Sequence, residues 1–402
     1  MGVPPLAVGD RIRHWRSRRG RTQAAVAGLC GITEVYLSKI ERGLKTPSLD
    51  VLQALAAELG VPLAALLSED PVPGSPVTAR WGIEPSVSQA LMGYGPAASR
   101  DPVTPAALRE RVESAWRVWQ SSPERFTQAA AVLPALIADT EHATRAYTRG
   151  SDAAARREVL RCAADLYFML RSYCRRTGRV DLSLMAADRA LRAAQDADDP
   201  IRIAAAQWNL GHVLLADGEE DGAQQVALLG IEQLQQATSD PVVPALTGAL
   251  QLVAVVADSR RRRWSAAHHR LTHHAVPRAR ESGEGNAMWT VFGPTNVLLH
   301  QVSIEMEAGE AAEALRAADQ VDADRLPSLE RRFTFLLEVA HCYALRREDP
   351  AVLVHLLDLE AMAPEDLARS PLARDMVVGL RRRVRPTYRR QVEGLADRMG
   401  LG

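Results

Sequence analysis

The feature that most constrains the fold is a run of short amphipathic segments, each bounded by residues that begin or end a helix. Glycines at 20 and 60 interrupt the helical pattern, because glycine readily leaves helical geometry. Thr22 and Thr33 each precede a segment, where a hydroxyl can accept a hydrogen bond from a free backbone N–H. With a tight turn at Gly31, the pattern predicts five helices, at about 9–19, 23–29, 33–43, 47–60 and 62–67.

The third segment has two different faces when it is drawn as a helix of about 100° per residue. Tyr36, Leu37 and Ile40 fall on one side, where they can pack against the rest of a small domain. A helix with a second, polar face has room to enter the major groove of DNA. The alternative is an ordinary solvated helix surface. The residues of the second face are Glu34, Val35, Ser38, Lys39 and Arg42.

Several short motifs recur at a specific spacing between residues 12 and 61. They are Ile12-Arg13-x-Trp15-Arg16, Gly20-x-Thr22-Gln23, Val26-Ala27, Gly31-Ile32-Thr33, Leu37-Ser38-Lys39-Ile40-Glu41-Arg42-Gly43, Pro47-Ser48-Leu49 and Leu55-Ala56-x-x-Leu59-Gly60-Val61. With these motifs, about the first 68 residues resemble the XRE family, the phage-repressor type of five-helix DNA-binding domain. One departure is Arg21, where an apolar residue is more usual.

The resemblance implies a role for each matching position. The second helix should bind a phosphate at its N-terminus. Val35 can contact a thymine methyl group, and Lys39 can contact a guanine. Arg16 and Glu41 match the family's buried ion pair between the first and third helices, which is a structural role. Residues expected at base edges are Glu34, Val35, Ser38 and Lys39, and those expected at phosphates are Thr22, Gln23, Arg42 and Lys45.

Charge is distributed unevenly along the chain, although its formal net charge is zero. Residues 1–68 contain nine Lys or Arg against five Asp or Glu, a balance of +4, so the remainder carries −4. A basic module on an acidic body is typical of a segment that seeks phosphates attached to one that avoids nucleic acid. The four cysteines (Cys30, Cys162, Cys174 and Cys342) form no C-x-x-C pair, which favours reduced thiols over a zinc site.

Residues 69–103 are expected to link two domains. Three prolines and one glycine between 68 and 79 indicate a semi-extended hinge. The apolar residues that follow should pack against the second domain; they are Trp81, Ile83, Leu91, Met92 and Tyr94. From 104 to 402 the pattern is helical throughout, with helices expected at about 105–120, 123–147, 152–177, 180–197, 201–217, 219–237, 241–258, 263–282, 287–308, 310–321, 327–347, 350–362 and 371–399.

The expected helix hairpins share a spacing, in which a turn residue is followed five positions later by a residue that is usually small. The pairs are Gly178/Ser183, Gly218/Ala223 and Gly309/Ala314, and more loosely Arg262/Ala267 and Arg347/Val352. The unit Trp208-Asn209-Leu210-Gly211 before Gly218 resembles a tetratricopeptide repeat. We therefore predict an all-α chain: a five-helix lambda-repressor-like DNA-binding domain (1–68) followed by an α-solenoid of tetratricopeptide-like helix hairpins (104–402).

A solenoid of this kind binds ligands on a concave face lined by the first helix of each pair. In resembling regulators, asparagines on these helices hold a peptide backbone. Asn209 and Asn296 are therefore the expected effector-binding residues, because one amide can both donate and accept. The alternative for each is a polar contact between helices.

Other clusters are weaker candidates for chemistry. His268, His269, His273 and His274 share a helix but have no carboxylate or cysteine at ligand spacing, and the arginines at 260–263 would repel a cation. This arginine run can contact phosphates, or it can be a solvated turn. No G-x-S-x-G, Walker A, G-x-G-x-x-G or H-E-x-x-H motif is present. We expect no catalytic residue, no metal and no cofactor.

The sequence thus predicts a bacterial transcription regulator that binds a double-stranded DNA operator as a homodimer. Its second domain would sense a peptide, as in quorum sensing, or a small-molecule effector. No secretory or membrane-spanning segment is evident, so a soluble, cytoplasmic protein is expected. One alternative is an antitoxin-like or scaffold protein whose solenoid binds a protein partner and whose first domain serves autoregulation. A third is an enzyme centred on the histidine cluster.

Overall fold

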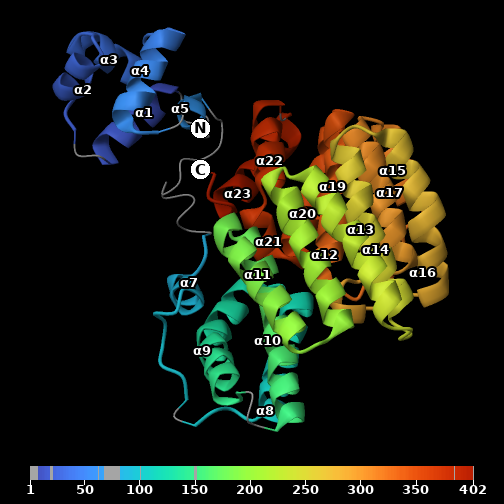
Figure 1. Ribbon diagram of the computed structural model, residues 1–402. Coiled ribbons are helices and arrows are strands. Elements are labelled where there is room, and N and C mark those ends of the chain that lie inside the picture. The colour runs from blue at the N-terminus through green and yellow to red at the C-terminus, as the bar shows by residue number, and fades with distance from the viewer. Residues whose placement is uncertain are drawn as a thin grey trace. The chain divides into compact units, whose positions relative to one another are not determined.

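The computed structural model describes residues 8–18, 21–61, 63–67, 82–99, 101–148, 152–383 and 385–401 (Figure 1). The chain divides into two compact units, residues 1–82 with 396–402 and residues 83–395. We call them the head and the body and describe each by itself. The described residues form helices and turns and contain no strand, so the predicted all-α fold class is confirmed. The predicted hinge at 68–79 lies outside the described residues.

The head contains the five predicted helices. Capping and turn residues set their ends: Thr22, Thr33 and Ser48 each accept a hydrogen bond from a backbone N–H of the first turn. Gly60 ends the fourth helix with a left-handed backbone, φ 58°. The core consists of apolar residues from all five helices, among them Ile12, Val26, Leu37, Ile40, Leu55, Leu59 and Leu66. The helices are α1 (Val8–Arg18), α2 (Gln23–Leu29), α3 (Glu34–Glu41), α4 (Leu49–Leu59) and α5 (Leu63–Leu67).

The body is a stack of helix hairpins (Figure 1). Its first half contains α7 (Pro85–Leu91), α8 (Pro105–Ser121), α9 (Arg125–Ala146), α10 (Ala153–Arg176), α11 (Val180–Asp196), α12 (Pro200–Asp217), α13 (Glu220–Ala237) and α14 (Val243–Arg260). The elements that follow along the chain are α15 (Trp264–Arg270), η1 (Leu271–Ala275), α16 (Val276–Ser282), η2 (Ala287–Trp289), α17 (Pro294–Ala308), α18 (Ala311–Ala318), η3 (Ala323–Arg325), α19 (Leu329–Leu345), α20 (Asp349–Met362), α21 (Pro364–Arg369), α22 (Pro371–Arg383), η4 (Pro386–Tyr388) and α23 (Arg389–Arg398).

Several predicted features of the body need correction. The helix expected at 371–399 is interrupted at Pro386, and the short helix α21 was not predicted. The helix expected at 263–282 contains a π-helical turn, η1, just before Pro277, which has no backbone N–H to donate to the carbonyl of an earlier turn. Met92 and Tyr94, expected to pack on the body, are 42% and 64% exposed.

The helix expected at 287–308 begins only at Pro294. Before it, Met288, Trp289 and Val291 have positive φ angles of 48°, 59° and 54°, which a continuing helix does not allow. Tertiary contacts explain the departure: Trp289 stacks on Trp116 of α8, with ring centroids 4.6 Å apart. Side-chain packing between segments distant in sequence therefore overrides the local helical pattern here.

The hairpin turns repeat one geometry. Gly178, Gly218 and Gly309 have left-handed backbones, with φ of 77°, 80° and 86°. Arg262 and Arg347 occupy the same turn position with φ of 56° and 60°, despite their side chains. The residues five positions after these turns are all buried, each with at most 1% exposure; they are Ser183, Ala223, Ala267, Ala314 and Val352. The predicted equivalence of the five turns is confirmed, and with it the α-solenoid.

The first helices of the hairpins form an inner row, in which each helix contacts the next: α10, α12, α14, α17 and α19. The two ends of this row are also joined, because Arg176 of α10 donates through Nε to Glu330 of α19 at 2.7 Å. Arg125, at the start of α9, is fully buried and bridges Glu330 (3.1 Å) and Asp366 of α21 (3.0 Å). The row therefore curves back on itself. None of the described helices is both long and apolar enough to cross a membrane.

Candidate functional site

The candidate DNA-binding surface is built from α2, the turn after it and α3. Gly31 in the turn has φ 66°, and the backbone N–H of Ile32 donates to Ala27 at 3.0 Å. Thr33 then caps α3 by accepting from the backbone N–H of Tyr36 at 3.2 Å. This capped turn fixes the angle between the two helices, as a helix-turn-helix requires.

The two predicted faces of α3 are present. Leu37 and Ile40 are buried to within 1% exposure and belong to the core of the head, while Tyr36 is half-buried against it. On the other face Val35 is 64% exposed. Glu34, Lys39 and Arg42 are also exposed, and Ser38 is half-buried. The base-contacting residues expected from the sequence therefore lie on the outer face of α3, available to a partner of the head.

The predicted ion pair between α1 and α3 is confirmed. Arg16 donates through Nε to one carboxylate oxygen of Glu41 at 2.7 Å and through a terminal nitrogen to the other at 2.9 Å. The Glu41 side chain is 1% exposed and that of Arg16 is 13% exposed. Hydrogen bonding to Glu41 raises the pKa of Arg16. The pair holds the recognition helix against α1.

Gln23 has a partner that sequence reasoning missed. Its Nε2 donates to Glu41 at 2.6 Å, so the amide joins the Arg16–Glu41 pair and connects α2 to α3. The amide NH2 carries two hydrogens, so the second N–H of Nε2 stays available to donate to a phosphate. Gln23 can therefore hold Glu41 and still contact a phosphate with the same amide nitrogen. The Thr22 hydroxyl accepts from Ala25 at 3.2 Å and keeps its own proton for donation.

The remaining expected phosphate contacts are exposed. Lys45 and Arg42 are solvent-exposed, and Arg42 donates through Nε to the backbone oxygen of Ser38 at 3.2 Å. Arg21, where the family pattern has an apolar residue, forms an ion pair with Glu58 of α4. A surface charge pair thus occupies the place of an apolar contact between these parts of the head.

The two asparagines expected to bind an effector differ in how far their side-chain hydrogen bonds are satisfied within the body. Asn209 is 1% exposed, and its amide is used on both sides: Oδ1 accepts from Arg171 at 2.7 Å and Nδ2 donates to Ala205 at 2.8 Å. Asn209 therefore makes a polar contact between helices, which is the alternative stated for it above. Asn296 is 2% exposed, but its Oδ1 has no hydrogen-bond partner among the described residues.

Asn296 lies one helical turn before His300, whose pKa is lowered by Arg331, a member of a cationic cluster that the sequence analysis missed. We call the inner cluster Arg171 and Arg175 of α10 with Arg331 of α19; their charges act together on the ring of His212 in α12. Burial and these charges hold the pKa of His212 well below its ordinary value. The spacing of Arg171 and Arg175, four residues apart on an inner helix, was the available signal, but it resembles an ordinary charged helix surface.

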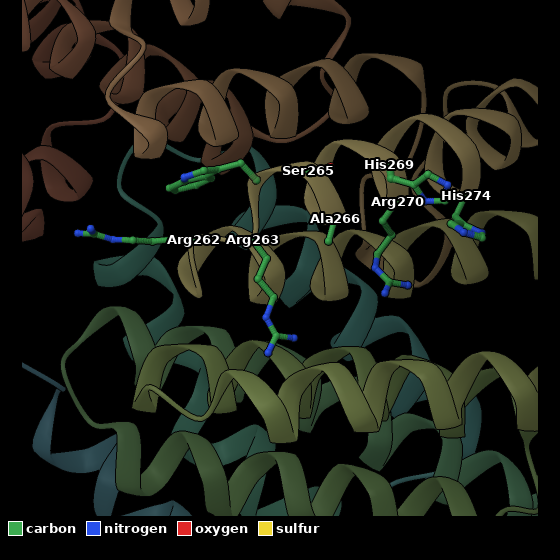
Figure 2. Close-up of a pocket in the computed structure, with 8 residues that line it drawn as sticks. Arg262, Arg263, Ser265, Ala266, His269, Arg270 and His274 are labelled. Atoms are coloured by element: carbon green, nitrogen blue, oxygen red, sulfur yellow. The ribbon is translucent and has the colours of Figure 1, made fainter.

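The histidine cluster and the arginine run lie beside a surface pocket of about 870 Å³ that includes Trp264 (Figure 2). Figure 2 shows His269 and His274 close together at one end, while Arg262 extends away at the other. Arg270 is tied to Asp258 by Nε at 3.1 Å. Within the described part of the chain, no three histidine, cysteine or carboxylate side chains are grouped to hold a metal ion.

Comparison with known proteins assigns residues 7–68. A family model described as a helix-turn-helix domain matches residues 7–68. The immunity repressor protein of Bacillus phage phi105 is 37% identical over 65 residues, covering 16% of this chain and 45% of the repressor. The transcriptional regulator SinR of Bacillus licheniformis is 38% identical over 63 residues, covering 15% of this chain and 57% of the regulator. The chain spans about half the length of these curated relatives.

Several solved structures align with most of the chain. Among them is a Rap protein complexed with Competence and Sporulation Factor, 11% identical, with 91% of this chain and 100% of that chain covered and a TM-score of 0.44. A TM-score of this size does not establish a shared fold for the whole chain. The family model, the relatives and the capped turn before the exposed face of α3 agree, so residues 7–68 are a helix-turn-helix domain of the XRE, phage-repressor type.

Proposed function

We propose that this protein is a sequence-specific, DNA-binding transcription regulator that acts as a homodimer. The observation that carries the proposal is the outer face of α3, where Val35 and Lys39 are exposed while Leu37 and Ile40 hold the helix in the core. A helix presented in this way can enter the major groove and contact base edges. Two half-sites one helical turn apart are the usual target of such heads, which favours a dimer.

We further propose that the body regulates DNA binding by holding an effector, and that it does so without catalysis. The inner row places polar side chains of several hairpins together, and the buried Oδ1 of Asn296 has no partner among the described residues. A buried polar atom left without a partner is costly, and a ligand donor would satisfy it. An effector that prefers one conformation of the body would shift the population of DNA-competent dimers.

Genome-wide capture of DNA fragments by the purified full-length protein, with and without extract of the source culture, tests the proposal. We expect a set of fragments that share one pseudo-palindromic motif, and a changed yield when extract is present. Capture of fragments without a common motif would contradict sequence-specific binding. A single enriched site beside the protein's own gene, insensitive to extract, would instead favour the antitoxin-like alternative.

A further inference from the structure

Three guanidinium groups of the inner cluster lack a carboxylate of their own. Arg171, Arg175 and Arg331 form no ion pair with any described residue, although each is attracted by the nearby charge of Glu330. The carboxylate of Glu330 already accepts hydrogen bonds from Arg125 and Arg176. Buried or half-buried arginines are normally matched by an acid, because leaving a charge unmatched in a protein interior is costly.

The same conclusion follows from the charges around the cluster. Arg125 and Arg176 are balanced by Glu330 and Asp366, to which they are hydrogen-bonded or adjacent. Arg171, Arg175 and Arg331 then remain as three positive charges. Burial, and then repulsion from neighbouring arginines that include Arg176 and Arg331, lowers the pKa values of Arg171 and Arg175. The like charges therefore destabilise one another, and a bound anion would offset this repulsion.

After Glu330, the acid whose charge acts on Arg331 is Glu338, and it is only partly ionised at neutral pH. Glu338 of α19 faces Ser303 and Glu307 of α17, and burial raises its pKa to about 7. His300 of α17, whose pKa is lowered to about 4 by burial and by Arg331, adds no charge. Apart from Glu330, which is already paired with Arg125 and Arg176, these two neighbours are neutral or only partly charged, which leaves the cluster electropositive.

Hydrogen-bonding capacity at the cluster is also unused. The Nε of Arg175 is buried and has no acceptor among the described residues. Arg171 is 4% exposed and uses Nε on Asn209, while no described residue accepts from its two terminal nitrogens. Asn296, one helical turn before His300 on α17, supplies the buried acceptor Oδ1. The site therefore offers guanidinium donors together with an acceptor for a ligand N–H or O–H.

We propose that Arg171, Arg175 and Arg331 form a binding site for an effector that carries at least two negative charges on oxyanion groups, with Asn296 accepting a hydrogen bond from the same ligand. This inference rests on the proposed function, because it names the chemical class of the effector. Guanidinium groups bind carboxylates and phosphates through paired hydrogen bonds, so both groups share the required chemistry. An acidic peptide and a phosphate compound are the two sources to be distinguished.

Thermal unfolding of the full-length protein tests the site with defined probes. The probes are sodium pyrophosphate, a tripeptide of glutamate and the matching tripeptide of glutamine, each compared with sodium chloride at equal ionic strength. We expect pyrophosphate, triglutamate or both to raise the Tm of the body by about 5 °C at ~100 times Kd. Triglutamine should leave it unchanged. A shift with only one of the two anions identifies the source.

Variants separate ligand binding from a structural role. Arg175→Met removes one repelling charge, so the ligand-free protein should have an equal or higher Tm, while the anion shift falls below about 1 °C. Arg331→Met should show the same two results, an equal or higher Tm without ligand and a smaller anion shift. It provides the test if Arg175→Met does not fold. The matched control is Arg192→Met, because Arg192 is 75% exposed and paired with Asp188. This variant should keep the full anion-dependent rise in Tm.

Two results would overturn the site. One is a wild-type protein whose Tm responds to neither anion. The other is an Arg175→Met protein that loses stability without ligand but keeps the shift, because this is the behaviour of a structural arginine. Operator binding by the same preparations is measured in parallel: loss of the anion site with intact operator binding leaves the proposed DNA-binding function standing.

Discussion

Glu41 holds together three parts of the head, because Arg16 of α1 and Gln23 of α2 both donate to its buried carboxylate. Its position on the inner face of α3 means that it supports the DNA-binding surface without facing it. The ion pair was predictable from the motif, since both residues fall at matched positions. The role of Gln23 was not, because a side chain at the start of a helix can point to solvent or inward, and only the packed structure decides between them.

Glu41→Ala should therefore destabilise the head by about 3–5 kcal/mol, because it leaves Arg16 without its partner. Gln23→Ala removes one hydrogen bond and should cost about 1.5 kcal/mol. Hydrogen exchange of the full-length protein, read on peptides from residues 8–41, measures both. Equal exchange in the Glu41→Ala and wild-type heads would show that the pair contributes no stability.

Glu338 gives the body a pH dependence whose sign can be worked out. Burial raises its pKa from 4.5 to about 7, so the folded body favours the protonated form. This stabilisation is present in full below pH 4.5 and is lost as the pH rises through 7. The side chain of Glu338→Gln stays neutral at every pH. The free energy of unfolding of this variant should therefore match that of the wild type at pH 5 and exceed it at pH 8 by up to about 3 kcal/mol. Denaturant unfolding at the two pH values checks this, and a difference independent of pH would contradict it.

At the scale of elements, the hairpin turns provide an internal comparison. A left-handed backbone costs an ordinary residue about 1–2 kcal/mol, while glycine adopts it freely. Gly309 and Arg347 occupy equivalent turns with φ of 86° and 60°. Gly309→Ala should then destabilise the body by roughly 1 kcal/mol, and Arg347→Gly should stabilise it by roughly 0.5 kcal/mol. Shifts of the same sign in thermal unfolding would show that these two turns are not equivalent.

Most helices were predictable because each has its own apolar period and its own start and stop signals. The turns at Gly178, Gly218 and Gly309 carry that signal in their glycines, and Arg262 and Arg347 could be found only by their spacing. The non-helical stretch before Pro294 could not be predicted, since it depends on Trp289 stacking against Trp116, far away in the sequence. Predictions of helix boundaries are wrong where a contact between distant segments overrides the local pattern.

At the scale of the whole molecule, the closure of the inner row could not be predicted from the sequence. Arg125 reaches Asp366 across 241 positions, and nothing in the composition of either segment indicates the pairing. This closure brings α10 and α19 together and so assembles the inner cluster from residues that look like surface charges. The predicted domain order and fold class could be obtained from patterns, while the candidate effector site depends on how distant hairpins meet.

The central claim is that the outer face of α3 reads DNA sequence, and the chain's only two lysines allow a matched test. Lys39 lies on that face and Lys45 follows it, and both are exposed. The measurement is the affinity of the wild type, Lys39→Ala and Lys45→Ala for the captured site and for a scrambled duplex, over a range of salt concentrations.

Lys39→Ala should bind the captured site about 10- to 100-fold more weakly and the scrambled duplex nearly as well as the wild type, because a base contact is lost. Lys45→Ala should weaken binding to both duplexes alike and reduce the salt slope by about 0.9, because a phosphate contact is lost. A Lys39→Ala protein that still distinguishes the two duplexes as the wild type does would contradict the account.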